Sequence, residues 1–326
     1  MQPNLNPLSR RQFLRRGALL AGATAALGPR FPASAAAPTP PPVIDTHIHL
    51  YDTARPGVHW PPREIPVLYS PHLPAQFQAL TQNLGVSAAI VIEANAEPDD
   101  NLWVLDLAKT NPAIAGYIGR LTPGQPGFAA RFDRYAQNPV FRGLRLRDDM
   151  IAQGLGQAAF EKDLRRVAER GLTLDIVGSA AVLSAVPRIA KIVPHTPLVI
   201  DHLPFGEWDR DPALIRPALR EAAALPNVYA KISSVLRQVD GRVLADQGYY
   251  ASRLDILWEL LGDDRVLYGS NWPVSDLIAP YAKVYQVVAD YVRHRGEKAA
   301  GQFFWKNSVA TYGWLRPPAT LHPVHE

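Results

Sequence analysis

The sequence contains no cysteine among its 326 residues. This absence excludes disulfides, cysteine metal ligands and a cysteine nucleophile, and it suits an oxidising compartment such as the periplasm. Beyond its first 37 residues the chain also lacks an uninterrupted apolar run of about 18 residues. No Gly-rich phosphate-binding fingerprint follows its first predicted strand, and the sequence has no Gly-x-Ser-x-Gly elbow. We therefore expect no membrane span in the mature chain, and neither a dinucleotide-binding site nor a serine-hydrolase elbow.

Acidic residues are missing from residues 1–37, which carry Arg10, Arg11, Arg15, Arg16 and Arg30. The formal net charge of the whole chain is +4, but the remainder holds 29 Lys and Arg against 30 Asp and Glu, a net charge of −1. The basic character thus belongs to the leader, so nucleic acid is not an expected partner. With 47% hydrophobic residues overall, the chain has enough apolar material for a large core.

The leader has the pattern of a twin-arginine export signal. Residues 9–15 read Ser-Arg-Arg-Gln-Phe-Leu-Arg, and an apolar stretch at 17–27 and an Ala-x-Ala site ending at Ala35 follow. The apolar stretch is shorter than the roughly 20 residues that a membrane span needs. We expect residues 1–35 to be a signal peptide recognised by the twin-arginine export machinery, and residues 36–326 to be a soluble periplasmic protein. A basic tail without export function is the competing interpretation.

From residue 43 onward, short β-branched runs alternate with segments whose apolar residues recur at helical spacing. The helical spacing is clearest at 160–170, 180–193 and 254–261, and a final helix pair is expected at 281–295 and 298–312. The runs that predict strands lie at 43–50, 88–93, 114–121, 141–147, 172–177, 198–202, 228–233 and 265–271. Strands that alternate with helices pair in parallel through right-handed crossovers. Eight such units in about 270 residues fit a single-domain (β/α)8 TIM barrel of the α/β class better than an open doubly wound sheet.

One predicted connection is unusually long. Residues 51–73, just after the first strand, form a Pro-rich segment that includes His59, Trp60, Arg63 and His72. Loops beyond about 12–15 residues are uncommon unless they serve a function. In a barrel this loop would lie on the C-terminal face, where active sites are built, so we interpret it as a lid or substrate wall.

Histidines mark the ends of two predicted strands. Side chains alternate along a strand, so Asp45, His47 and His49 are expected on one face of the first strand. His202 ends the sixth strand, with Asp201 expected to point the opposite way. Two histidines at i, i+2 can share a metal ion, although a structural polar pair has the same pattern. A third histidine at another strand end favours a shared site.

These motifs resemble the amidohydrolase-related family of TIM-barrel metal-dependent hydrolases. The resemblance rests on His-x-His in the first strand, Asp-His in the sixth and Gly-Ser-Asn-Trp-Pro in the eighth, and it extends over residues 43–312. The most similar branch contains the fuconolactonase-like and 2-pyrone-4,6-dicarboxylate lactonase-like hydrolases. The resemblance implies that His47, His49 and His202 either bind a divalent metal or polarise the substrate carbonyl directly without one. Three histidines suit Zn, Mn and Fe nearly equally.

The resemblance also implies an Asp base at the end of the eighth strand, where this chain has Asn271. An amide cannot accept a proton at neutral pH, and losing a positioned base costs a factor of about 10² to 10⁴ in rate. Three explanations compete. Asn271 could bind substrate while His202, Glu93 or Asp276 acts as base; a metal-bound water could need little further help; or the protein could bind a ligand without catalysis.

Substrate contacts are expected from Arg145, which matches the family pattern and could hold a carboxylate or a polarised lactone oxygen. Strand alternation places Arg147 on the same side. Trp60 and Trp272 could stack on a sugar-like ring, although most of the seven Trp residues should serve packing. For Lys231 we favour an ion pair within the barrel or a helix-side position over a carbamylated bridging ligand.

These observations predict a hydrolase that opens a lactone by water attack at the top of the barrel. The small-molecule substrate would be a sugar-acid lactone or a carboxylated cyclic ester. A metal-dependent decarboxylase of the same superfamily is the alternative enzyme. A periplasmic binding protein without catalysis is the alternative from another class, because the usual Asp is Asn271.

Overall fold

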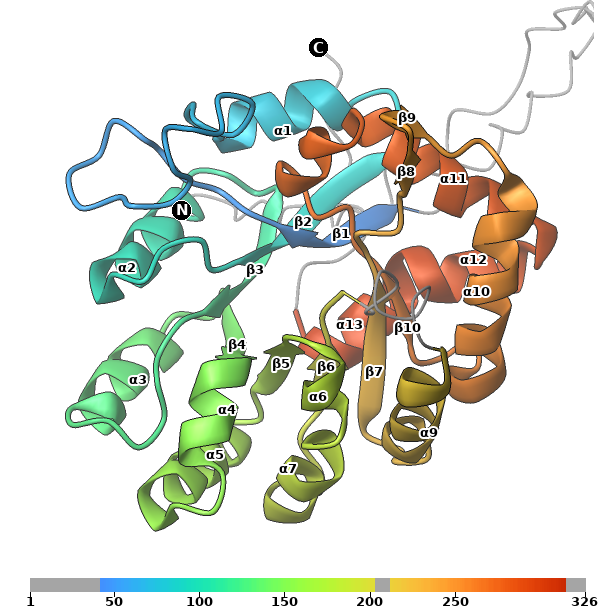
Figure 1. Cartoon of the computed structure of the whole chain (residues 1–326). Helices are drawn as coiled ribbons and strands as arrows, with labels where there is room; N and C mark the ends of the chain where they lie inside the picture. The colour runs from blue at the N-terminus through green and yellow to red at the C-terminus, as the bar shows by residue number, and fades with distance from the viewer. Residues whose placement is uncertain (1–41, 203–211, 315–326) are drawn as a thin grey trace, which may run out of the picture. The chain divides into compact units, whose positions relative to one another are not determined.

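The computed structural model describes residues 42–202 and 212–314, and the predicted signal peptide lies outside these ranges. Parallel strands form the centre of the molecule and helices surround them (Figure 1). The sheet has eight strands in the order β1-β2-β3-β4-β5-β6-β7-β10. Their bounds are β1 Val43–Ile48, β2 Val86–Ile92, β3 Ile114–Gly119, β4 Phe141–Arg147, β5 Thr173–Val177, β6 Leu198–Ile200, β7 Val228–Ile232 and β10 Val266–Tyr268.

The last strand returns to the first and closes the barrel. A parallel bridge joins Ile48 to Trp272. The His49 amide donates to the Trp272 carbonyl at 2.8 Å, and the Asn271 amide donates to the His47 carbonyl at 2.9 Å. The predicted TIM barrel is confirmed, and each of its eight predicted strands overlaps an observed one. A short hairpin of β8 Gln238–Val239 and β9 Arg242–Val243, which follows β7, was not predicted.

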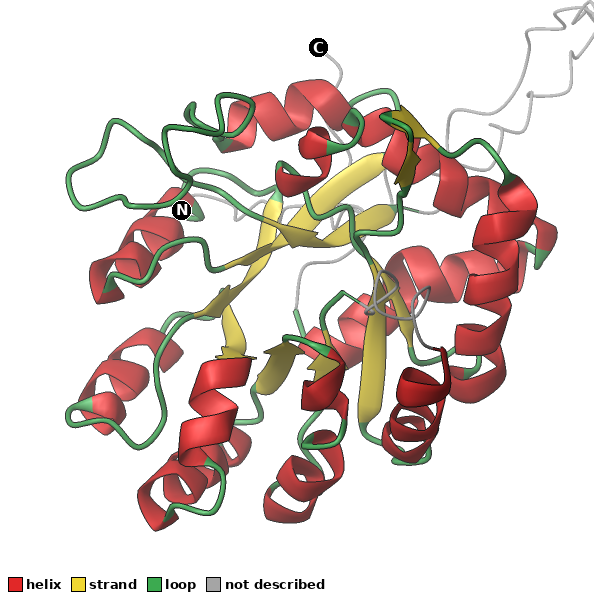
Figure 2. Ribbon diagram, viewed as in Figure 1, coloured by secondary structure: helices red, strands yellow, loops and turns green. Residues whose placement is uncertain are grey.

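Helices lie outside the strands, as Figure 2 shows. The segment at 180–193 was predicted as one helix but forms two, and the segment at 298–312 contains a π-helical turn at Gln302–Lys306. The helices are α1 Pro74–Thr81, α2 Pro98–Leu107, α3 Phe128–Ala136, α4 Asp148–Gly154, α5 Ala158–Glu169, α6 Ala180–Leu183, α7 Val186–Ile192, α9 Pro212–Ala223, α10 Gln247–Leu261, α11 Tyr281–His294, α12 Glu297–Gly301 and α13 Asn307–Tyr312, with a 3-10 turn at Val274–Leu277. No helix in the described ranges is long and apolar enough to cross a membrane.

The first strand carries a bulge that decides where its polar side chains point. Asp45 pairs with Ala89 and Ile48 pairs with Val91, so three steps along β1 match two along β2. The prediction that Asp45 shares a face with the two histidines is therefore wrong. The Asp45 carboxylate accepts a hydrogen bond from the Tyr281 hydroxyl of α11 at 2.9 Å, outside the barrel.

The long loop at 51–73 is closed at its base. The backbone amides and carbonyls of Tyr51 and His72 exchange two hydrogen bonds, at 3.0 and 2.8 Å. The ring of Trp60 lies against Tyr51, with centroids 4.9 Å apart. This pairing fixes the loop at the carboxyl end of β1, where a substrate wall was expected.

The barrel interior contains a fully buried ammonium group. Lys231 of β7 is 0% exposed, and its Nζ lies 2.5 Å from Asp175 Oδ2 and 2.9 Å from Asp201 Oδ1. The Tyr312 hydroxyl donates to the same Asp175 oxygen at 3.0 Å. The predicted ion pair within the barrel is confirmed for Lys231. Burial raises the pKa of Asp175 to about 6, although Lys231 opposes this rise.

Removing the ammonium should leave Asp175 without its cation and Asp201 paired with Arg145 alone. We expect Lys231→Met to lower the free energy of unfolding by about 3–5 kcal/mol, because breaking a buried ion pair uncovers the desolvation cost of its partner. Chemical denaturation measures this change. Adding Asp175→Asn should recover part of the loss, since one carboxyl is then neutral.

The matched control is Lys109→Met. Lys109 forms an exposed ion pair with Asp106, at 2.7 Å with a side chain 69% exposed. Surface ion pairs contribute about 0–1 kcal/mol, so the control should stay close to the wild type. A Lys231→Met protein as stable as this control would contradict the importance of the buried network.

Candidate active site

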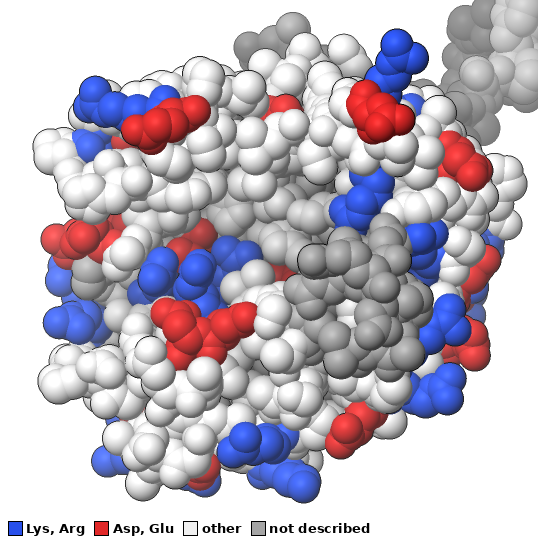
Figure 3. Space-filling model, in the orientation of Figure 1, with Lys and Arg blue, Asp and Glu red and all other residues white. Residues whose placement is uncertain are grey.

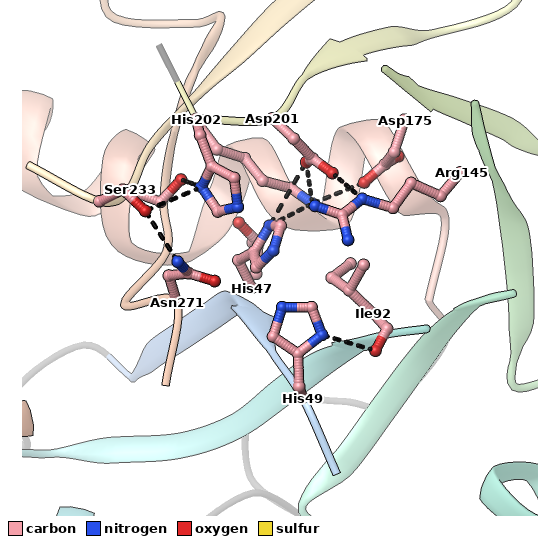
Figure 4. Close-up of polar contacts among 12 residues, drawn as sticks. His47, His49, Ile92, Arg145, Asp175, Asp201, His202, Ser233 and Asn271 are labelled. Atoms are coloured by element: carbon pink, nitrogen blue, oxygen red, sulfur yellow. Dashed lines mark hydrogen bonds and ion pairs between the residues drawn. The ribbon is translucent and has the colours of Figure 1, made fainter. Parts of the chain in front are cut away.

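Three histidine rings meet at the carboxyl end of the barrel (Figure 4). His47 and His49 come from the end of β1, and His202 follows β6. The ring centroid of His47 lies 4.2 Å from that of His202 and 5.1 Å from that of His49. The structure thus brings together the three histidines that the sequence analysis selected.

His49 is held in one tautomer by the backbone. Its Nδ1 lies 3.2 Å from the Ile92 carbonyl oxygen and 3.1 Å from the Glu93 carbonyl oxygen. Carbonyl oxygens only accept, so Nδ1 carries the proton in neutral His49. Burial lowers the pKa of His49 to about 4, with Arg145 adding to the effect. At neutral pH its Nε2 therefore presents a lone pair, which can accept a hydrogen bond or ligate a metal.

His47 is the most enclosed of the three. Its Nδ1 lies 3.4 Å from Asp201 Oδ1 and 3.5 Å from Lys231 Nζ. Burial lowers its pKa well below the usual value, and His202 adds to this lowering. The buried Nε2 of His47 has no hydrogen-bond partner within residues 42–202 and 212–314. A buried nitrogen of this kind indicates a position where a ligand atom belongs.

Asp201 stands at the centre of the site, where the sequence analysis did not expect it. Its Oδ1 faces Lys231 and His47, and its Oδ2 lies 3.0 Å from Arg145 Nε. Burial alone would raise the pKa of Asp201, but these neighbours outweigh it and hold the pKa well below its usual range. Both Asp201 and His202 follow Ile200, the last residue of β6, so strand alternation does not govern them.

Arg145 links the site to a second carboxylate at the barrel mouth. Its Nη1 lies 3.5 Å from Glu93 Oε1, while Arg120 Nη1 lies 3.7 Å from Glu93 Oε2. Burial raises the pKa of Glu93, against opposing contributions from Arg145, Arg120 and Arg147. Three arginines thus surround one glutamate. Basic side chains also gather at the hollow over this end of the barrel (Figure 3).

Asn271 follows β10 and points its side chain toward His202. Its Nδ2 donates to Ser234 Oγ at 2.8 Å, and its buried Oδ1 has no partner in the described part of the chain. His202 Nδ1 lies 2.8 Å from Ser233 Oγ and 3.3 Å from Ser234 Oγ. Neither serine was predicted as a site residue, and no motif in the sequence marks them.

The two tryptophans that were considered for substrate stacking occupy different environments. The Trp60 ring lies 5.8 Å from the His49 ring and is partly exposed. Trp272 is 1% exposed and packs against His72 and Phe77. We therefore keep Trp60 as the aromatic candidate for substrate contact, and we assign Trp272 to packing.

The alternative bases differ in their surroundings. Glu93 is bound by the arginines described above. Burial raises the pKa of Asp276, in the 3-10 turn after β10, to about 6, and Trp272 opposes the rise. The described structure gives Asp276 no contact with the three histidines.

A resident metal would need ligands that converge on one point. Within the described ranges, no three His, Asp or Glu side chains are placed so that they could hold one ion. The Nε2 atoms of His47 and His49 are available as donors, but Asp201 is paired with Lys231 and Arg145. The ligand set implied by the resemblance therefore does not form in this arrangement.

Comparisons with known proteins agree with the barrel fold. An L-fucono-1,5-lactonase of Burkholderia multivorans is 27% identical over 288 residues, covering 85% of this chain and 97% of that protein. A zinc-bound amidohydrolase structure from B. multivorans has a TM-score of 0.74 and 25% identity, covering 84% of this chain and all of the other. A putative 2-pyrone-4,6-dicarboxylic acid hydrolase from Pseudomonas putida, 18% identical with a TM-score of 0.65 over 85% of this chain and 99% of the other, shares the fold. The family model described as amidohydrolase matches residues 44–314, nearly the whole described barrel, and the chain belongs to this family.

Proposed function

We propose that the protein hydrolyses a lactone at the carboxyl end of its barrel. The observation that carries the proposal is the meeting of His47, His49 and His202 at the ends of β1 and β6, in a chain related to proteins named L-fucono-1,5-lactonase. Water attacks the lactone carbonyl carbon and forms a tetrahedral oxyanion. Collapse then breaks the bond between the acyl carbon and the ring oxygen. The ring oxygen takes the proton that the water lost, which gives a hydroxy acid and restores the group that had accepted it.

The attacking water needs hydrogen-bond acceptors. The Nε2 lone pair of His49 is one, because backbone carbonyls hold the ring proton on Nδ1. The buried Oδ1 of Asn271 is the second, since it has no other partner among the described residues. We assign His49 to accept the water proton and Asn271 to orient the water. His47 and His202 then face the carbonyl oxygen.

Arg145 favours a substrate with an anionic group. Its Nε and Nη1 contact Asp201 and Glu93. Figure 4 shows its guanidinium group next to the histidines. Arg120 and Arg147 add positive charge beside Glu93. We therefore propose a sugar-acid lactone or a carboxylated cyclic ester as the substrate, with Trp60 against its ring.

A divalent ion, such as Zn, Mn or Fe, would first use the Nε2 atoms of His47 and His49. It would supply a Lewis acid for the carbonyl. The arrangement provides no third ligand among the described residues.

Acid release from a panel of sugar-acid and dicarboxylate lactones tests the hydrolase assignment. We expect the wild type to release acid from at least one lactone, and His47→Ala to lower kcat by about 10²-fold or more, because a group facing the reacting carbonyl is lost. The control is His294→Ala, an exposed histidine at the end of α11, which should retain full activity. Full turnover by His47→Ala, or release of CO2 instead of acid, would contradict the assignment. Saturable binding without turnover would favour a binding protein.

The pH dependence of kcat/KM should reflect the neutral state of His49. Burial lowers its pKa to about 4, so its Nε2 stays an acceptor at neutral pH and is protonated only below that value. We expect metal-free enzyme to lose activity as the pH falls through about 4, with circular dichroism at each pH to separate unfolding from protonation. A loss of activity centred on the ordinary histidine value of 6.5, in folded protein, would contradict the role.

We further propose that the protein is exported to the periplasm by the twin-arginine machinery, which the leader sequence supports. Replacing Arg10 and Arg11 with lysines should keep the precursor in the cytoplasm. Cell fractionation and the mass of the mature chain, expected to start at Ala36, measure the outcome. Equal export of the Lys-Lys precursor and the wild type would refute this route.

A further inference from the structure

Three neighbouring strands of the barrel end in the same strained backbone conformation. His202 after β6, Ser234 after β7 and Asn271 after β10 have φ angles of 50°, 53° and 62°. They are three of the four non-glycine residues with positive φ in the described ranges. This left-handed conformation costs roughly 1–2 kcal/mol per residue, and such strain clusters at functional sites. All three lie at the mouth of the barrel.

The side chains of these residues form one hydrogen-bonded chain. Asn271 Nδ2 donates to Ser234 Oγ at 2.8 Å. An amide nitrogen can only donate, so Ser234 Oγ accepts in this bond and keeps its own proton for another partner. The other side-chain partner of Ser234 Oγ in the described structure is His202 Nδ1, at 3.3 Å. Hydrogen bonds are therefore donated from Asn271 to Ser234 and from Ser234 to His202.

Ser233 points to the same conclusion. Its buried Oγ lies 2.8 Å from His202 Nδ1. Among the described residues, this nitrogen is the side-chain partner of the Ser233 hydroxyl. If Nδ1 carried a proton, both serine hydroxyls would lose this acceptor, and a buried donor without an acceptor costs about 1–3 kcal/mol. If Nδ1 is unprotonated, it accepts from the serines. The proton of neutral His202 then resides on Nε2.

We propose that Asn271 and Ser234 are positioning residues that fix His202 in the Nε2–H tautomer, so that His202 donates a hydrogen bond to the carbonyl oxygen under attack. The catalytic part of this inference rests on the proposed lactone hydrolysis. His202 is then the opposite of His49, whose proton is held on Nδ1 by backbone carbonyls. One neutral imidazole donates to the developing oxyanion, and the other accepts from the water. Burial lowers the pKa of His202 to about 3, which agrees with a neutral ring.

The inference explains why an amide serves at position 271. A carboxylate there could only accept, so it would take the Ser234 proton and leave His202 Nδ1 without that donor. It would also place a negative charge beside a ring that must present a donor to an oxyanion. Asn271 is accordingly a residue that sets the direction of the hydrogen bonds, and not a base that has been lost.

Nuclear magnetic resonance tests the tautomer without any substrate. In protein labelled with ¹⁵N-histidine, long-range proton–nitrogen correlations distinguish Nε2–H from Nδ1–H rings, and a His202→Asn spectrum assigns the His202 signals. We expect Nε2–H at His202 and Nδ1–H at His49 in the wild type. In Asn271→Asp we expect a smaller Nε2–H population at His202, because the Ser234 donor is lost while Ser233 remains. Ser234→Ala, a smaller change, should populate the other form of His202 partially. The control is Asn83→Asp, which makes the same charge change at an exposed turn before β2.

Kinetics with any lactone that the enzyme turns over form the second readout. Asn271→Asp should lower kcat by about 10²-fold, the cost of one oxyanion donor, with little change in KM. An increase in kcat would overturn the inference, because the position would then be lacking a base. A His202 signal of the Nδ1–H form in the wild type, or an Nε2–H population in Asn271→Asp as large as in the wild type, would also overturn it. If no lactone is hydrolysed, the proposed function fails and the spectra still decide the tautomer.

Discussion

The ion pairing of Lys231 inside the barrel is the constraint on which the site depends. Its buried ammonium offsets the charges of Asp175 and Asp201. Asp201 can then stay ionised in the interior, where it contacts His47 and Arg145 together. Without Lys231 the pKa of Asp201 would rise, because only Arg145 would then offset its buried charge, and the contacts of Asp201 with His47 and Arg145 would weaken. The contact with Asp201 thus holds His47 in position, whereas hydrogen bonds to two backbone carbonyls hold His49.

Function begins where regular strand geometry ends. The bulge in β1 turns His47 and His49 inward together, while Asp45 turns outward to Tyr281. Beyond β6, β7 and β10, left-handed residues redirect the chain so that side chains from three strands meet. The strands supply a rigid frame, and the strained residues at their ends aim the polar groups. This division agrees with the placement of active sites at the carboxyl face of parallel barrels.

The sequence was sufficient for the frame and for the histidines, because both depend on local patterns. Alternation of β-branched runs with helical spacing predicted all eight barrel strands, and His47, His49 and His202 lie near strand ends as expected. Asp201 and the outward turn of Asp45 were missed because alternation fails at a bulge and past a strand end. Ser233 and Ser234 were missed for another reason. Their hydrogen bonds join them to residues about 30 to 40 positions away in the sequence, and a local sequence pattern cannot predict such contacts.

The departure of position 271 from the family pattern is best understood through these contacts. At the barrel mouth, Asp201 and Glu93 already place two carboxylates close to the substrate space, with Arg145 between them. A third carboxylate would add charge in a poorly solvated region and would compete with the developing oxyanion. An amide avoids this charge and still offers one donor and one acceptor. In Asn271 the donor reaches Ser234, and the acceptor has no other partner among the described residues, so a single neutral side chain can orient both a histidine and a water.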